Sequence, residues 1–283
     1  MRKISVVGLL LFLFASCSWN SAGKKEKEIQ SENLEYQLMA ENTSKMKKIF
    51  FVLPSPIETS LLINKSGIVF QKDLLNSTEK LVGYSTSTSR AIALGIYCAD
   101  LSYSGINEQF QTSIEYLNVT RNLAESLGIL RAVDPKKIKL LEDNLTNKEL
   151  VIDVISEVYM ESHEQLREQD RYLLASLMLI GGWVESLYLA TQSVKPNEVS
   201  HQILIERILD QQLSLESVKS VLSENQSNPV IQPIYKDLLD LERLFKKSII
   251  SKNNEMDFYG RVNLEAFEQL ILKVNAIRDY IVD

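Results

Sequence analysis

Apolar residues along this chain recur at the spacing of α-helices. The clearest example follows Asn263, where apolar side chains return every three or four residues on one side of the segment: Leu264, Phe267, Leu270, Ile271, Val274, Ile277 and Ile281. This spacing predicts an amphipathic helix, and no segment shows the sustained alternation that predicts a strand. Links between successive helical segments are short, which favours antiparallel neighbours. The sequence therefore predicts an all-α fold, an irregular multi-helix bundle of mostly antiparallel helices.

Two predicted helices, residues 88–104 and 170–191, are apolar on nearly every face. A helix of this kind is covered on several sides, so we expect both helices to lie in the centre of the fold. The run from Leu173 to Val184 is shorter than a bilayer-spanning helix, and Glu185 ends it. A transmembrane helix is therefore disfavoured here.

Several helix ends are marked by capping residues and by glycine. Ser55-Pro56-Ile57-Glu58 and Thr146-Asn147-Lys148-Glu149 match the capping box, which predicts that a helix begins at each. Asn197 is expected to cap a further helix. Gly105 is expected to separate the first central helix from a long helix over about 107–127.

The chain begins with the layout of a signal peptide, in which a basic start precedes a short apolar run from Val6 to Ala15. The residues Leu13-Phe14-Ala15-Ser16-Cys17 resemble a bacterial lipobox, in which small residues precede a cysteine that becomes the lipidated N-terminus. The resemblance implies that residues 1–16 are removed and that Cys17 is the site of lipid attachment. The alternative is an ordinary signal peptide that is cut nearby.

Beyond the signal peptide, the sequence predicts a flexible tether over residues 17–31 and a single helical domain over residues 32–283, with its first helix at about 32–51. Acyl chains such as palmitate would hold the protein in a membrane of the cell envelope. Ser18, rather than an aspartate, follows Cys17. By the sorting rule for bacterial lipoproteins this predicts the outer membrane, on either its periplasmic or its surface face.

Composition excludes several classes of function. The net charge is −6, and loss of Arg2 and Lys3 with the signal peptide makes it −8, so no nucleic-acid partner is expected. Two cysteines and two histidines are too few for a structural zinc or iron–sulfur site, and no glycine-rich nucleotide motif is present, so no cofactor is expected. Acylation of Cys17 would leave Cys98 without a disulfide partner, and its apolar neighbours predict that its thiol is buried.

Two stretches are distinctive, Gly95 to Tyr103 and Gly181 to Ala190. Together with the lipobox-like residues they resemble a group of exported helical lipoproteins of Bacteroidota that has no established function. The resemblance implies export and a helical fold, and it supplies no catalytic residues. Read physically, Gly181-Gly182 removes side chains from one patch, which predicts either a bend or the close approach of a neighbouring helix.

Each central helix carries one carboxylate, Asp100 in the first and Glu185 in the second. A buried carboxylate must be paired, hydrogen-bonded or protonated, and we expect a tyrosine hydroxyl or an arginine to hold at least one of them. Four aromatic residues lie close to them in the sequence: Tyr97, Tyr103, Trp183 and Tyr188. The favoured interpretation is a pair of core polar groups that fix the helix register. The alternative is a small polar pocket lined by these acids and aromatic rings.

Other candidate sites are weaker. Glu198-Val199-Ser200-His201 supplies one of the two Glu-x-x-His pairs that a ferritin-like metal site needs, and Met160 stands three residues before His163, so no metal site is predicted. The acidic residues between Asp153 and Glu168 follow helical spacing. They predict a solvated helix face with local ion pairs.

These patterns predict a lipid-anchored protein of the cell envelope that acts as a non-enzymatic binding or assembly module. Its expected contacts are the membrane, through the N-terminal lipid, and another envelope protein. One alternative is a small-ligand-binding protein or a hydrolytic enzyme with its site near Asp100 and Glu185. A further alternative is a purely structural envelope protein.

Overall fold

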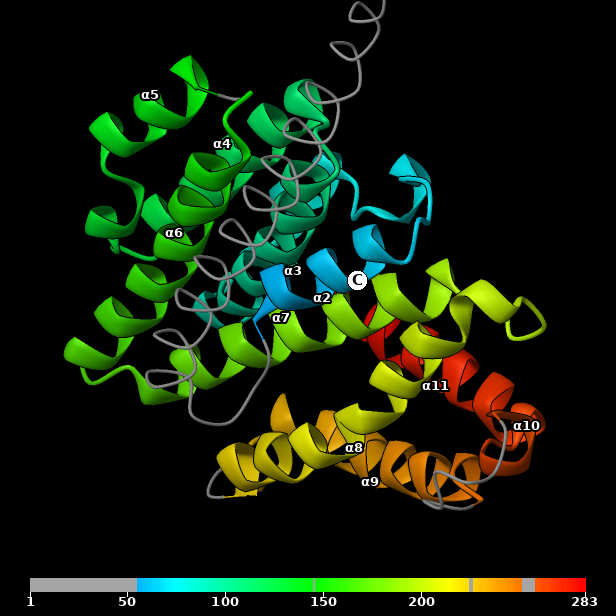
Figure 1. The fold of residues 1–283 in the computed structure, drawn as a ribbon. Coiled ribbons are helices and arrows are strands. Elements are labelled where there is room, and N and C mark those ends of the chain that lie inside the picture. Colours follow the sequence, from blue (N-terminus) through cyan, green and yellow to red (C-terminus); the bar gives the residue numbers. More distant parts are fainter. Residues whose placement is uncertain (1–54, 145, 224–225, 251–257) are drawn as a thin grey trace, which may run out of the picture. The chain divides into compact units, whose positions relative to one another are not determined.

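Helices make up most of the part of the chain that the computed structural model describes, which is residues 55–144, 146–223, 226–250 and 258–283 (Figure 1). The α-helices are α2 (Pro56–Lys65), α3 (Ser87–Ile106), α4 (Phe110–Ser126), α5 (Pro135–Asp143), α6 (Lys148–Glu168), α7 (Tyr172–Ser193), α8 (Gln202–Ser223), α9 (Ile231–Ser248), α10 (Phe258–Arg261) and α11 (Leu264–Val282). Short 3₁₀ turns join some of them: η1 (Lys72–Leu74), η2 (Thr78–Gly83), η3 (Leu130–Val133) and η4 (Val199–His201). These ranges contain no strand, and Ile249 and Val262 form only an isolated bridge. The predicted all-α class is confirmed. The predicted signal peptide, tether and first helix, together with Cys17, lie outside the described residues.

Two of the predicted helix starts are placed differently in the structure. Ser55 caps α2 as expected, and its hydroxyl accepts a hydrogen bond from the Glu58 amide. Helix α6, however, is capped by Asn147 rather than Thr146, because the Asn147 side chain accepts from the Leu150 amide and asparagine is at least as good a cap as threonine. Asn197 caps no helix, since the chain there forms a turn followed by η4.

Gly105 does not end the first central helix, contrary to the expectation from sequence. Helix α3 continues through it to Ile106, and the chain reverses at Glu108, which has a positive φ of 57°. The glycine is needed for helix packing instead. A Cβ at this position would lie 2.8 Å from Cδ1 of Ile155 on α6, so the absence of a side chain lets α6 lie close to α3.

Helices α3 and α7 cross at backbone contact in the core. A Cβ on Gly95 would lie 1.9 Å from the carbonyl oxygen of Met178, and a Cβ on Gly181 would lie 2.2 Å from the carbonyl oxygen of Ile92. Real side chains do not approach backbone atoms this closely, so only glycine fits at either position. The close approach predicted for Gly181-Gly182 is confirmed, and Gly95 provides the matching gap on α3.

The central pair is parallel, whereas chain neighbours are antiparallel. Gly181 lies against Ile92 and Ser193 against Tyr103, so the residue numbers of α3 and α7 rise together across the contact. Helices α9 and α11, which only α10 separates in the chain, are antiparallel, because the end of α9 meets the start of α11 at Ser248 and Asn263 while Lys273 pairs with Asp237. Helices α4, α5 and α6 lie on one side of the crossing, and α8, α9 and α10 on the other (Figure 1).

Helix α7 is the one helix among the described residues that is long and apolar enough to cross a membrane. The helix continues past Glu185 to Ser193, so its length alone would allow a membrane span. Most of its apolar window, 72%, is buried inside the protein. Since that surface is covered by α3, α2, α6, α8 and α11, α7 packs here as the core helix that the sequence predicts.

Candidate functional site

The crossing of α3 and α7 brings the two candidate acids together. Asp100 on α3 and Glu185 on α7 both have 0% of their surface exposed. Each follows its crossing glycine by about one turn, five residues after Gly95 and four after Gly181. Because the helices are parallel and in backbone contact, these two offsets place both carboxyl groups in the same layer of the core.

Glu185 is held by an arginine from the C-terminal helix. Arg278 on α11 donates from Nε to Glu185 Oε2 at 3.1 Å and from Nη2 to Oε1 at 3.2 Å, so the pair is bidentate. The guanidinium also lies over the ring of Tyr188, with 4.6 Å from Cζ to the ring centroid. Burial raises the pKa of Glu185, and Arg278 opposes that rise. The expectation that an arginine or tyrosine holds a buried acid is met by Arg278.

The surroundings of Asp100 favour its protonated form. Its Oδ2 accepts the backbone N–H of Asn76 at 3.1 Å, but no donor in the described ranges reaches its Oδ1. Burial and the charge of Glu185 raise the pKa of Asp100 well above its usual range, and a hydrogen bond between the two carboxyl groups raises it further. Two carboxylates can form such a bond only if one is protonated. Because Arg278 stabilises the charge on Glu185, Asp100 is the acid whose protonated form is favoured.

The loop that precedes α3 links Asp100 to the C-terminal helix through a chain of hydrogen bonds. The carbonyl oxygen of Asn76 accepts from the Tyr116 hydroxyl at 2.8 Å, and its Nδ2 donates to the Tyr84 hydroxyl at 3.0 Å. The Tyr84 hydroxyl in turn donates to the carbonyl oxygen of Val282 at 3.2 Å. The loop that positions Asp100 is therefore tied to the end of the helix that carries Arg278. We call Asn76, Tyr84, Asp100, Glu185 and Arg278 the buried network.

The sequence grouped six side chains, the two acids and four aromatic residues, and these do not form one site in the structure. Asp100, Glu185 and Tyr188 lie together. Tyr97 lies beside them, but its hydroxyl donates to the carbonyl oxygen of Ser77 at 2.7 Å rather than to a carboxylate. Tyr103 lies farther along α3, where its ring is 5.0 Å from that of Phe70 and its hydroxyl accepts the N–H of Gln71.

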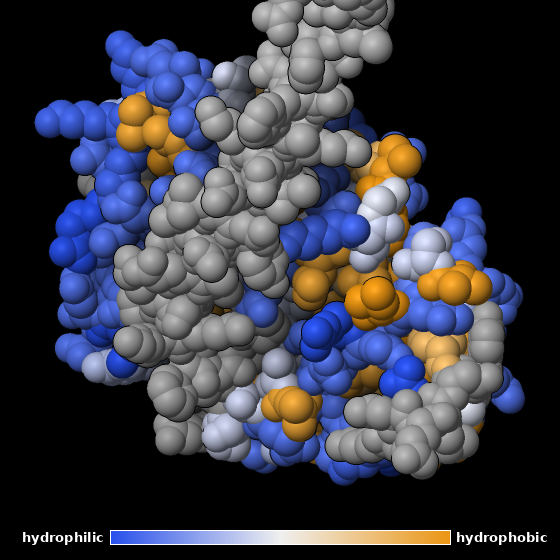
Figure 2. Space-filling view, in the orientation of Figure 1, coloured by the Kyte–Doolittle hydropathy of each residue, from blue (hydrophilic) through white to orange (hydrophobic). Residues whose placement is uncertain are grey.

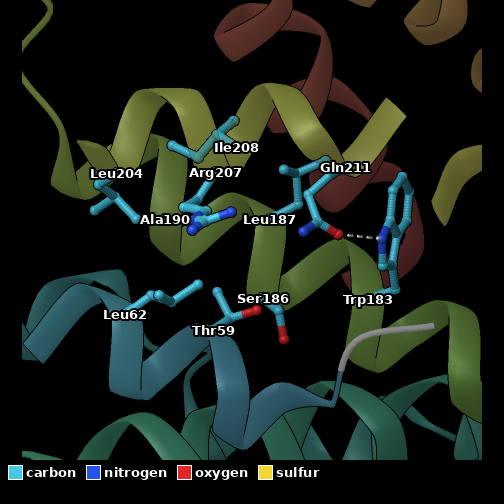
Figure 3. A pocket seen from close by; sticks show the side chains of 10 residues that line it. All are labelled: Thr59, Leu62, Trp183, Ser186, Leu187, Ala190, Leu204, Arg207, Ile208 and Gln211. Carbon is cyan, nitrogen blue, oxygen red and sulfur yellow. Dashed lines mark hydrogen bonds between the residues drawn. The ribbon is translucent and has the colours of Figure 1, made fainter. Parts of the chain in front are cut away.

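Trp183 belongs to a different site, a groove on the opposite side of α7. Its indole N–H points to Oε1 of Gln211 on α8 at 3.4 Å (Figure 3). We call this site the α2–α7–α8 groove, and its empty space, counting the part open to solvent, is about 320 Å³. The groove is lined by Thr59 and Leu62 from α2, by Trp183, Ser186, Leu187 and Ala190 from α7, and by Leu204, Arg207, Ile208 and Gln211 from α8.

Sequence reasoning missed Arg278 and Asn76. Arg278 had a visible signal, because it interrupts the apolar stripe of the terminal helix between Ile277 and Ile281. Asn76 had none, since it holds Asp100 through its backbone N–H, which every residue except proline possesses.

The weaker candidates are accounted for by local contacts. Cys98 is buried, as predicted, and burial raises the pKa of its thiol to about 12, which keeps it protonated and unreactive. His201 accepts the backbone N–H of Lys195 at its Nδ1, and its Nε2 lies 3.4 Å from Glu198. Among the described residues no group of three side chains has a metal-binding arrangement. Burial lowers the pKa of His163 to about 4, so this histidine is neutral at physiological pH.

The acidic face of α6 carries one ion pair within the helix, of the kind that its spacing predicts, and two ion pairs to neighbouring elements. Glu157 pairs with Lys137 at 2.5 Å, Glu164 with Arg167 at 3.5 Å, and Glu168 with Arg131. These pairs are largely exposed to solvent, where such contacts contribute little stability. This face is therefore a solvated surface rather than a binding stripe.

Comparison with protein-family models, with curated protein sequences and with solved structures gave no match. The buried network is a closed contact in which each acid has an internal partner. Neither carboxyl group has exposed surface, so a solute could reach them only if α3, α7 and α11 separated.

Proposed function

We propose that this chain is a lipid-anchored protein of the cell envelope that acts by binding another envelope component and not by catalysis. The observation that carries the non-catalytic part is the closure of the buried network. Asp100 and Glu185 were the leading candidates for acid–base chemistry, and general acid–base catalysis requires contact with a substrate. Here one acid is paired with Arg278, and the other accepts the backbone N–H of Asn76.

The anchoring part of the proposal is supported by the sequence. Cys17 follows small residues at the end of an apolar run, which is where lipoprotein processing takes place. The acidic mature chain would gain little attraction to an anionic leaflet, so acyl chains rather than charge would hold it at the membrane. Two or more chains give stable membrane residence where one is marginal.

The anchor is tested by labelling with an alkyne analogue of palmitate. The chain has two cysteines, so Cys98→Ala leaves Cys17 as the only thiol and Cys17→Ala leaves Cys98. Wild type and Cys98→Ala should both be labelled and sediment with membranes. Cys17→Ala should be unlabelled, and either released from the membrane or retained as uncut precursor. Normal maturation and fractionation of Cys17→Ala would overturn the anchor.

The binding role is tested by affinity capture of the tagged full chain from detergent-solubilised membranes. A stoichiometric envelope partner that is recovered with wild type and with Cys17→Ala would support a protein-binding role that is independent of the anchor. A Glu185→Gln variant that still folds but has lost a hydrolytic or small-ligand activity would contradict the proposal, because it would show that the buried network acts on a substrate.

A further inference from the structure

Helices α9 and α11 lie side by side near the C-terminus and present one face to solvent (Figure 1). Their contact is marked by Lys273 on α11, whose Nζ lies 2.5 Å from Asp237 Oδ1 and 3.6 Å from Asp240 Oδ2. In both helices a contact residue follows an exposed residue by one position, Asp237 after Lys236 and Lys273 after Leu272. One position is a rotation of about 100°, and antiparallel helices turn in opposite senses when viewed from the same end. Both exposed rows therefore point to the same side of the molecule.

The two helices carry opposite charges on this side. The exposed charged residues of α9 are all basic, and those of α11 are all acidic: Lys236, Arg243, Lys246 and Lys247 on α9, and Glu265, Glu268 and Asp279 on α11. Three large apolar side chains lie among them, Leu239, Leu272 and Tyr280, which are 40%, 68% and 51% exposed. We call these residues together the α9–α11 face.

The charges of this face indicate a partner, whereas a hydrophobic patch alone indicates only that something covers it. Figure 2 shows such patches near α5 and over α2. On the α9–α11 face, Lys247, Glu265 and Glu268 form no ion pair with another residue of the described chain. A surface that carries a basic row beside an acidic row is complementary to a second copy of itself.

Two contacts align the helices along their length. The N–H of Asn263 donates to the carbonyl oxygen of Ser248 at 2.8 Å where α9 ends and α11 begins, and Lys273 pairs with Asp237 about three turns away. Counted from these contacts, three pairs of exposed residues are level with each other to within about one residue: Leu239 with Leu272, Arg243 with Glu268, and Lys247 with Glu265.

We propose that a second copy of this chain binds to the α9–α11 face and forms a two-fold symmetric dimer. The symmetry axis runs parallel to the helices, so α9 of each copy lies against α11 of the other. Rotation about this axis keeps every residue at its level along the helices. The three level pairs therefore meet between the copies, with a leucine pair in the middle and two ion pairs toward one end. A two-fold axis across the helices would instead place basic α9 against basic α9.

The face has the size of a small interface. Helices of 18 and 19 residues are about 27 Å long, and two neighbours span about 20 Å. Two such faces bury about 1,100 Å² in total, just above the roughly 1,000 Å² that a specific interface needs. The dimer should therefore dissociate readily, and salt should weaken it. Self-association is separate from the lipid anchor and from another envelope component, so failure of either proposal leaves the other intact.

Co-capture of two differently tagged full-length copies from detergent-solubilised cells tests the dimer. Arg243→Glu with Lys247→Glu makes α9 acidic, and Glu265→Lys with Glu268→Lys makes α11 basic. A double variant that is present in both tagged forms places like charges across both contacts, which should lower co-capture at least tenfold. When the two double variants are expressed together, one with each tag, opposite charges meet again at both contacts. Co-capture should then recover to near the wild-type level.

A matched control reverses two charges elsewhere. Lys136→Glu with Lys139→Glu changes two exposed residues of α5 and should leave co-capture unchanged. Wild-type co-capture should fall several-fold in about 1 M salt, where charges are screened beyond about 3 Å. Recovery by the mixed pair also shows that both double variants fold. The proposal is overturned if wild-type copies do not co-capture at low salt, if neither double variant lowers co-capture, or if the mixed pair does not restore it.

Discussion

Helix α7 has two contrasting sides. On one side Gly181 and Glu185 meet α3 and α11 through backbone contact and a closed set of charged hydrogen bonds. On the other side Trp183, Leu187 and the groove meet α2 and α8 through ordinary apolar packing that stays partly open. The difference shows which contacts determine how the helices are arranged. On the side of the buried network, the glycine contacts and the ion pair require one particular arrangement of the helices. On the side of the groove, any set of apolar side chains of suitable size can pack.

The largest effect should come from breaking the buried ion pair. Glu185→Gln removes the carboxylate that pairs with the buried guanidinium of Arg278, which should lower the free energy of unfolding by about 3–5 kcal/mol in a urea titration. Glu157→Gln, which breaks an exposed pair on α6, should cost less than about 1 kcal/mol.

A double variant separates charge pairing from shape at the same site. Glu185→Gln combined with Arg278→Met removes both charges and should recover most of the stability that Glu185→Gln loses, since apolar replacements of buried ion pairs are often neutral or better. A double variant as unstable as the two single changes added together would mean that the ion pair is not the main constraint on this side of α7.

The next largest effect should come from the crossing itself. Gly95→Ala places a methyl group where Met178 and Gly182 have backbone atoms, so α3 and α7 must move apart, at a cost of about 1–3 kcal/mol or more. Gly83→Ala is the matched control, because a Cβ there meets nothing within 4 Å. Thermal melts of the two variants should differ by several degrees. Similar melting would show that the close approach is not required.

A smaller effect concerns the proton on Asp100. Folding raises the pKa of this carboxyl, so above about pH 4 the folded chain holds a proton that the unfolded chain releases, and stability falls as pH rises at up to about 1.4 kcal/mol per unit. Asp100→Asn keeps the acceptor for Asn76 and a donor for Glu185 and should abolish that slope. Urea titrations between pH 4 and 6 compare it with exposed Asp73→Asn, which should keep the wild-type slope. An Asn variant that is less stable than wild type at pH 6 would refute the protonated Asp100.

The two sides of α7 also differ in what the sequence could predict. Helix class, the central place of α3 and α7, and burial of Asp100, Glu185 and Cys98 follow from local composition, and all are found. The partner of Glu185 could not be derived, because Arg278 is 93 residues away and only the three-dimensional fold brings it there. Gly105 was misread for a related reason. Glycine ends helices and also permits close packing, and only the position of α6 decides between these two roles.

The smallest effect is expected on the groove side. Gln211 accepts the indole N–H of Trp183 at 3.4 Å, a long hydrogen bond between residues that line a partly open groove. Its loss in Gln211→Ala should cost at most about 1 kcal/mol, because water can replace a half-exposed partner. Gln212→Ala, a half-exposed neighbour on α8, controls for helix propensity. Urea titrations of both should give nearly equal midpoints. If Gln211→Ala lost as much stability as Glu185→Gln, the two sides of α7 would not differ in this respect, because the groove contacts would then constrain the fold as strongly as the buried network does.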